Sequence, residues 1–217
     1  MQREGHRVPG VLLTPDQPEP GSPVPLVLVG HGRTLHSRHA APYALARRLA
    51  RRDRVAVALI DLPGHGERPS REDALAHDER RRLAAEDWGA TLDGLLALPE
   101  LESSRVGYWG LSLGTDYGLP FVADDGRVSA AVLGLYGTRS SRIGDTDALG
   151  LCEQVRCPVL YVMQWDDGMF ERSGQLEVFD AIGSEDKRMV VYPGDHDDTP
   201  DEGLRLAREF LVRELSR

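Results

Sequence analysis

Short apolar runs alternate with helical patterns along most of the chain, and this alternation limits the fold more than any other feature. Each run is rich in Val, Leu and Ile and leads through a turn bearing Gly or Asp into apolar residues at helical spacing. The runs are Pro25–Val29, Val55–Ile60, Arg105–Trp109, Ser129–Leu135, Val159–Met163 and Arg188–Tyr192. The helical candidates are Ala40–Arg51, Asp73–Ala84, Asp87–Leu98, Gly174–Ile182 and Gly203–Leu215. We therefore predict an α/β fold with a mostly parallel central sheet and helices on both faces.

A proline-rich segment stands near the start of the chain. Pro15–Pro25 contains five prolines and lies between the strand-like runs Val8–Leu13 and Pro25–Val29. Because proline cannot donate a backbone hydrogen bond to a sheet, the segment predicts a long turn that joins two antiparallel strands.

Size and charge narrow the class of protein. A chain of 217 residues with 41% hydrophobic and 28% charged residues is typical of a single globular domain, which we expect to span residues 1–217. The net charge of −9 repels phosphate backbones, which argues against nucleic-acid binding. No apolar run approaches the roughly 20 residues of a membrane span. The N-terminus lacks the apolar run of a signal peptide, so we expect a cytoplasmic protein.

The strongest chemical signal follows the strand Arg105–Trp109. There the chain reads Gly110-Leu111-Ser112-Leu113-Gly114, a Gly-x-Ser-x-Gly turn with a strand before it and a helix after it. Such a turn exposes the serine hydroxyl at its tip, and the small glycines allow the strand and the helix to approach closely. The serine also stands at a helix N-terminus, where developing negative charge is favoured.

With this turn in place, the chain resembles the α/β-hydrolase superfamily and, within it, the small dienelactone-hydrolase-like esterases. The likeness covers nearly the whole chain. Its motifs are Val29-Gly30-His31-Gly32-Arg33, Asp61-Leu62-Pro63-Gly64-His65-Gly66, Gly107–Gly114 and the loops after Met163 and Tyr192. The resemblance implies a serine nucleophile at Ser112. True dienelactone hydrolases carry cysteine at this position, so their lactone specificity does not transfer. Dehalogenases and epoxide hydrolases of this fold carry aspartate there, and Ser112 argues against both.

A serine hydroxyl needs an imidazole to take its proton and a carboxylate to orient that imidazole. His196 is the only histidine after Ser112, and it follows the strand Arg188–Tyr192 in the loop where the family places its base. The acid is expected after Val159–Met163, where Asp166 and Asp167 compete. We favour Asp167, because Met169 and Phe170 follow it at the spacing that the family shows, and Asp166 stays the alternative.

The resemblance also implies an oxyanion hole made of two backbone N–H groups. One belongs to Leu113, directly after the nucleophile, and the other to Arg33 in the loop after an early strand. The Arg33 side chain is expected to project into solvent, although Arg38 and His36 in the same loop leave an acidic substrate open.

The remaining polar residues of interest have structural explanations. We interpret His31 and His65 as loop residues that hydrogen-bond the backbone, and Asp61 as the cap of the turn after its strand. We expect Cys152 and Cys157 to be reduced thiols, because two cysteines alone make neither a disulfide framework nor a zinc site. No metal site and no cofactor are predicted.

The lengths of the connecting segments bear on the substrate. The interval from Leu135 to Val159 has no room for a cap domain, and the charged stretch Asp73–Ala84 is unlike an apolar lid. We therefore predict an open, shallow pocket that takes small soluble molecules.

The leading hypothesis is a serine esterase that cleaves small carboxylic esters through an acyl-enzyme. A thioesterase or peptidase with the same residues is the alternative, and a non-catalytic ligand receptor of the same fold is a third reading. The sequence leaves the oligomeric state open.

Overall fold

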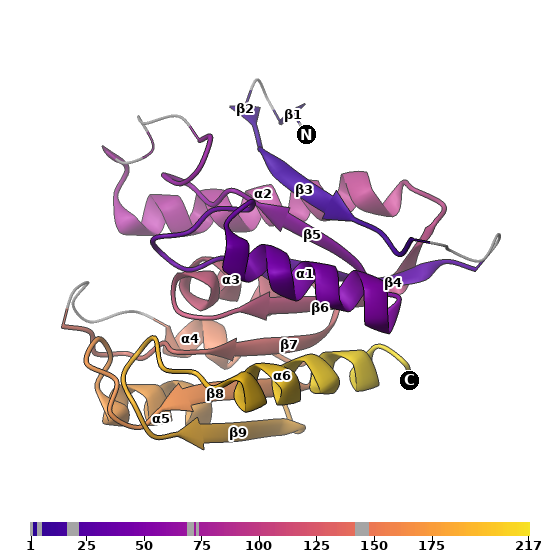
Figure 1. Ribbon diagram of the computed structural model, residues 1–217. Coiled ribbons are helices and arrows are strands. Elements are labelled where there is room, and N and C mark those ends of the chain that lie inside the picture. The colour runs from indigo at the N-terminus through magenta and orange to yellow at the C-terminus, as the bar shows by residue number, and fades with distance from the viewer. Residues whose placement is uncertain (1, 4–5, 17–21, 69–71, 73, 142–147) are drawn as a thin grey trace.

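The computed structural model describes residues 2–3, 6–16, 22–68, 72, 74–141 and 148–217. These residues form nine strands and six helices, and strands and helices alternate from β4 onward (Figure 1). The strands are β1 (Gln2–Arg3), β2 (His6–Arg7), β3 (Gly10–Leu13), β4 (Val24–Gly30), β5 (Ala56–Ile60), β6 (Leu101–Gly110), β7 (Val128–Gly134), β8 (Val159–Gln164) and β9 (Lys187–Tyr192). The helices are α1 (Ala40–Asp53), α2 (His77–Leu96), α3 (Leu113–Asp124), α4 (Leu149–Cys152), α5 (Arg172–Ala181) and α6 (Asp201–Glu214).

Seven strands form one central sheet in the order β3-β5-β4-β6-β7-β8-β9. All neighbouring pairs are parallel except β3 with β5, so the predicted mostly parallel sheet is confirmed. Strands β4, β5, β7 and β8 are buried almost throughout, and so is the second half of β6, because helices cover both faces of the sheet. This burial explains their apolar sequences.

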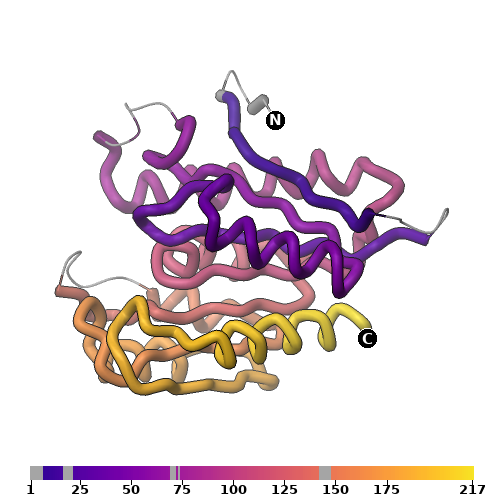
Figure 2. The backbone as a smooth tube through the Cα atoms, in the orientation of Figure 1, coloured from indigo at the N-terminus to yellow at the C-terminus, as the bar shows by residue number. Residues whose placement is uncertain are grey.

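Two helices cover one face of the sheet and four cover the other. Helices α1 and α6 pack with Val27, Val57 and Trp109 on one side, where Figure 2 shows them in front of the strands. Residues of α2, α3, α4 and α5 pack with Leu26 and Tyr108 on the opposite side. This division follows the strand order, because a right-handed crossover that moves along the sheet in the other direction lies on its other face.

The strands on either side of the proline-rich segment run antiparallel, as predicted, and β5 lies between β3 and β4 in the sheet. Part of that predicted turn, residues 17–21, lies outside the described residues.

The two helices predicted at Asp73–Ala84 and Asp87–Leu98 are one helix, α2. Ala85 and Glu86 between them are good helix formers, so nothing interrupts the hydrogen-bond ladder. The helix begins at His77, where the Glu79 carboxylate accepts a hydrogen bond from the Ala76 N–H at 2.9 Å. Residue 73 lies outside the described part.

Strand register brings the functional loops to one edge of the sheet. Gly30 at the end of β4 pairs with Gly110 at the end of β6, and Gln164 of β8 pairs with Tyr192 of β9. The strand order also reverses at β4, and ligands of open α/β sheets bind beside such a switch point at the carboxyl ends of the strands.

Candidate active site

Ser112 occupies a strained turn between β6 and α3. Its backbone has φ 56° and ψ −118°, a conformation that is energetically unfavourable for every residue except glycine. The Ser112 N–H donates to the Gly134 carbonyl at 2.9 Å, which ties the turn to the end of β7. A Cβ added to Gly110 would lie 2.3 Å from the Gly114 oxygen, and one added to Gly114 would lie 2.6 Å from the Gly30 oxygen. Only glycine therefore fits at positions 110 and 114, two residues before and two residues after the serine.

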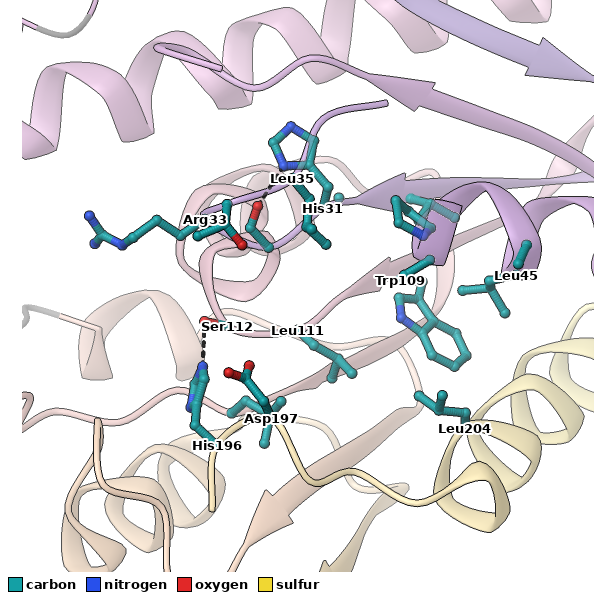
Figure 3. A pocket seen from close by; sticks show the side chains of 18 of the residues that line it. His31, Arg33, Leu35, Leu45, Trp109, Leu111, Ser112, His196, Asp197 and Leu204 are labelled. Atoms are coloured by element: carbon teal, nitrogen blue, oxygen red, sulfur yellow. Dashed lines mark hydrogen bonds between the residues drawn. The ribbon is translucent and has the colours of Figure 1, made fainter. Parts of the chain in front are cut away.

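The three side chains that the sequence singled out meet in one hydrogen-bonded row. His196 Nε2 lies 2.8 Å from Ser112 Oγ, and His196 Nδ1 lies 2.8 Å from Asp167 Oδ2 (Figure 3 draws the contact with the serine). Because the Asp167 carboxylate accepts hydrogen bonds, the histidine carries its proton on Nδ1 and leaves Nε2 to accept from the serine hydroxyl. The Phe170 ring lies against the imidazole, with centroids 5.8 Å apart.

The two competing aspartates occupy different environments. The Asp167 side chain is fully buried, and its Oδ1 accepts hydrogen bonds from the N–H groups of Met169 and Phe170 at 2.8 and 3.0 Å. The Asp166 carboxylate is exposed and lies 3.5 Å from Arg172. The structure therefore brings Asp167 to His196 and leaves Asp166 at the surface.

Asp195 links the loop of the acid to the loop of the base, a role that sequence reasoning missed. Its Oδ1 accepts hydrogen bonds from the N–H groups of Gly168 and His196, both at 2.7 Å. The only signal available in the sequence was its position next to His196. Asp201 and Glu202, a few residues further on, stand in the first turn of α6.

The loop after β4 lies beside the serine turn. Arg33 lines the same pocket as Ser112, and Leu113 is the first residue of α3. The backbone N–H groups of Arg33 and Leu113 make no hydrogen bond to another described residue. Figure 3 shows the Arg33 side chain extending away from the apolar side chains of the pocket. Arg38 is engaged elsewhere, since its guanidinium lies 2.9 Å from Glu67.

His31, His65 and Asp61 hold the loops together, as predicted. His31 Nδ1 donates to the Gly32 carbonyl at 2.8 Å, and its Nε2 accepts from the Leu62 N–H at 3.1 Å. Burial lowers the pKa of His31 from 6.5 to about 4, so the ring is neutral at pH 7. His65 Nδ1 donates to the Pro63 carbonyl, and Asp61 accepts from two backbone N–H groups of neighbouring loops.

Both cysteines are free, in agreement with the sequence prediction. Burial raises the pKa of the Cys152 and Cys157 thiols to about 12, so neither is a thiolate at neutral pH. Among the residues that the structure describes, His, Cys, Asp and Glu side chains form no group of three that suits a metal ion. The described helices include none that is both long enough and apolar enough to cross a membrane.

A pocket of about 550 Å³ opens beside Ser112 and extends between α1 and α6. This volume falls within the usual range for small-molecule sites. Large apolar side chains form most of its wall, and Figure 3 shows several of them next to the serine. They are Leu35, Leu45, Trp109, Leu111, Leu135, Met169 and Leu204. The segment lengths gave no sign of this pocket, because it lies between two helices that are far apart in sequence.

Comparison with solved structures places this arrangement among known proteins. A cold-adapted esterase from an Arctic intertidal metagenomic library is 34% identical, with a TM-score of 0.84 over 97% of this chain and 90% of the other. The chain belongs to the α/β-hydrolase superfamily. Two more distant α/β-hydrolases share the fold. Est1E from Butyrivibrio proteoclasticus, solved with ferulic acid bound, is 15% identical, with a TM-score of 0.79 over 99% of this chain and 98% of the other. A monoacylglycerol lipase from Paleococcus ferrophilus is also 15% identical, with a TM-score of 0.72 over 96% and 100%.

No family model and no curated protein sequence matches the chain. The predicted membership of the α/β-hydrolase superfamily is confirmed by the structural likeness. The narrower resemblance to dienelactone hydrolases stays a prediction, since the three proteins compared above are two esterases and a lipase.

Proposed function

We propose that this α/β-hydrolase, a carboxylic ester hydrolase, cleaves its substrates through an acyl-enzyme formed on Ser112. One observation carries the proposal: Ser112, His196 and Asp167 form a continuous hydrogen-bonded row at the mouth of an apolar pocket. A serine hydroxyl placed in this way is activated by the imidazole, and the carboxylate holds the imidazole in the required tautomer.

The reaction then proceeds in two halves. Ser112 Oγ attacks the ester carbonyl carbon while His196 Nε2 takes its proton. The N–H groups of Leu113 and Arg33 stabilise the negative charge on the carbonyl oxygen. The intermediate collapses, and the alcohol leaves with the proton from His196. Water attacks the acyl-enzyme while His196 takes a proton from it. The bond to Ser112 Oγ then breaks, His196 returns the proton to that oxygen, and the acid product departs. Asp167 stays ionised and stabilises the imidazolium throughout.

The two aspartates provide a matched test. Asp167→Asn is expected to lower kcat on a short p-nitrophenyl ester on the order of 10³-fold to 10⁴-fold, because the amide favours the wrong imidazole tautomer. Asp166→Asn, one residue away and exposed, is expected to change kcat less than about twofold. Equal effects of the two substitutions contradict the proposed acid.

The nucleophile is tested separately by labelling with a fluorophosphonate. The expected result is one label on Ser112 in the folded wild-type protein and none in Ser112→Ala. A protein that folds normally but takes no label would instead be a ligand receptor. A panel of esters, thioesters and anilides with the same acyl group then separates esterase from thioesterase and peptidase activity. The proposal includes small soluble esters as the substrates and the cytoplasm as the location of the enzyme.

A further inference from the structure

The pocket beside Ser112 is elongated along the two helices that line it, α1 and α6. Along α1 its lining residues run from Ala41 to Arg48, and along α6 they run from Asp201 to Arg208. Both helices run antiparallel to the sheet strands, away from the edge that carries Ser112. Seven helical residues rise about 10 Å. The pocket therefore reaches about 10 Å back from the serine along the face of the sheet.

The two ends of the pocket differ in charge. Asp197 and Asp201 line the end near the serine, and Arg48 and Arg208 line the far end. Arg33 also lies at the near end, but its side chain extends away from the apolar wall of the pocket (Figure 3). The Arg208 guanidinium lies 2.7 Å from both carboxylate oxygens of Asp53, which balances its charge. Arg48 is exposed and has no hydrogen bond or ion pair with another described residue. Within the described part of the chain, no carboxylate balances the positive charge of Arg48 at the far end.

The surface beyond Arg48 is also basic, although the whole chain carries a net charge of −9. A second hollow is lined by Ala44, Arg47, Arg48, Arg51 and Arg52. It shares Ala44 and Arg48 with the pocket, so the far end of the pocket opens onto the arginines of α1. An anionic group placed there stays partly hydrated while it faces cations, so it avoids the cost of burial in an apolar wall.

We propose that the preferred substrate is an ester with an apolar chain that ends in an anionic group, such as a carboxylate. The ester carbonyl lies at Ser112, the chain lies along Trp109, Leu45 and Leu204, and the anionic end faces Arg48. The reverse orientation is disfavoured, because it would place the anion beside Asp197 and Asp201. This inference rests on the proposed function, since it assumes that Ser112 is the nucleophile.

The test compares esters that differ only at the far end of the chain. In one series the acyl group is octanoyl or its ω-carboxylate counterpart, each as the p-nitrophenyl ester. In the other the acyl group is acetyl, and the alcohol is a long alkanol or the matching ω-hydroxy acid. In one of the two series, the ester that carries the carboxylate is expected to have the lower KM. This difference in KM should disappear when the salt concentration is raised. The series that shows it also tells whether the acyl part or the alcohol part occupies the pocket.

Substitution of Arg48 tests the residue itself. Arg48→Gln is expected to lower the ratio of kcat/KM for the preferred carboxylate ester to kcat/KM for the methyl-terminated ester about threefold to fivefold, through KM. Arg48→Glu is expected to have a larger effect in the same direction. Arg82→Gln removes the same charge from α2 on the opposite face and is expected to change neither ester. Because Arg48 is exposed on a helix, all three variants should fold.

Two results would overturn the inference. One is a wild-type enzyme that prefers the methyl-terminated ester in both series, and the other is an equal effect of Arg48→Gln and Arg82→Gln. Either result leaves the proposed esterase intact if Ser112→Ala is inactive on the acetyl ester. Full activity of Ser112→Ala on that ester would instead reject the proposed function.

Discussion

At the scale of single residues, the backbone of Ser112 shows how activity and stability oppose each other. A residue with φ 56° and ψ −118° stores conformational strain, which the hydrogen bond to Gly134 and the close contacts of Gly110 and Gly114 maintain. Glycine adopts this conformation without strain. The chain therefore keeps an unfavourable residue where the proposed chemistry needs a hydroxyl.

Two inactive variants measure this strain. Ser112→Gly is expected to be more stable to urea than Ser112→Ala by about 1 kcal/mol. Glycine relieves the backbone strain, and the greater conformational entropy of its unfolded chain offsets part of that gain. Neither variant can form an acyl-enzyme, so the difference in free energy of unfolding isolates the backbone effect. If the alanine variant is the more stable one, the turn is not strained.

His31 makes the stability of the protein depend on pH. Its pKa is lowered to about 4 in the folded state, while the unfolded chain has a pKa near 6.5. Between these values the unfolded state binds more protons, so the stability is fully present above pH 6.5 and is lost as the pH falls toward 4. Between about pH 7.5 and about pH 5 the expected loss is about 2 kcal/mol.

The variant His31→Gln removes the titration and keeps an oxygen that can accept from the Leu62 N–H. It should lose about 2 kcal/mol less stability than the wild type over that pH interval, as measured by urea denaturation at both pH values. Parallel pH dependence of the two proteins would show that His31 is not the group responsible.

At the scale of elements, Asp116 joins the nucleophile helix to its surroundings. Its buried carboxylate lies 2.6 Å from His77 Nε2 of α2 and accepts a hydrogen bond from the Tyr136 hydroxyl at 3.0 Å. Arg81 Nε lies 3.3 Å from the same carboxylate. Asp116 therefore connects α2, α3 and the segment after β7 one turn beyond Ser112.

Removal of this carboxylate leaves three polar side chains without their buried partner. Asp116→Ala is expected to lower the free energy of unfolding by about 3 kcal/mol. Asp78→Ala on the exposed side of α2 serves as the control and should change it by less than about 0.5 kcal/mol. Similar effects of the two substitutions on urea denaturation would refute the structural role of Asp116.

The elements also show what a sequence reveals and what it hides. The strands and most helices were predictable because their apolar spacing is local, and Gly110 and Gly114 marked the turn around Ser112. The pairing of β3 with β5 was not, because nothing within the two strands records which neighbour each one selects. The pocket depends on the distance between α1 and α6, so Leu45 and Leu204 carried no local sign that they face each other across a cavity. Asp167 was favoured over Asp166 only through family resemblance.

At the scale of the whole molecule, one sheet serves two apolar layers. Trp88 of α2 lies fully buried on one face, and Trp109 lies buried on the other. Both layers pack against the same strands, so neither can lose its contacts without exposing the sheet. This arrangement favours the predicted single domain.

Tryptophan fluorescence tests whether the two apolar layers unfold together as one domain. Variants that retain only Trp88 or only Trp109, made by Trp→Phe substitution at the other two positions, should each show a urea midpoint that coincides with the loss of helical circular dichroism in the same variant. A midpoint for one layer that clearly precedes the loss of helix would mean that the two faces unfold separately.

The reactive serine and the apolar wall of the pocket belong to different parts of the fold, which affects how substrate specificity can change. The nucleophile turn is fixed by glycines and strand ends, whereas Leu45 and Leu204 project from the covering helices into the pocket. Mutations at these two leucines can alter which molecules are accepted without disturbing the reactive groups. We therefore expect laboratory selection on the two helices to yield new specificities at little cost in turnover.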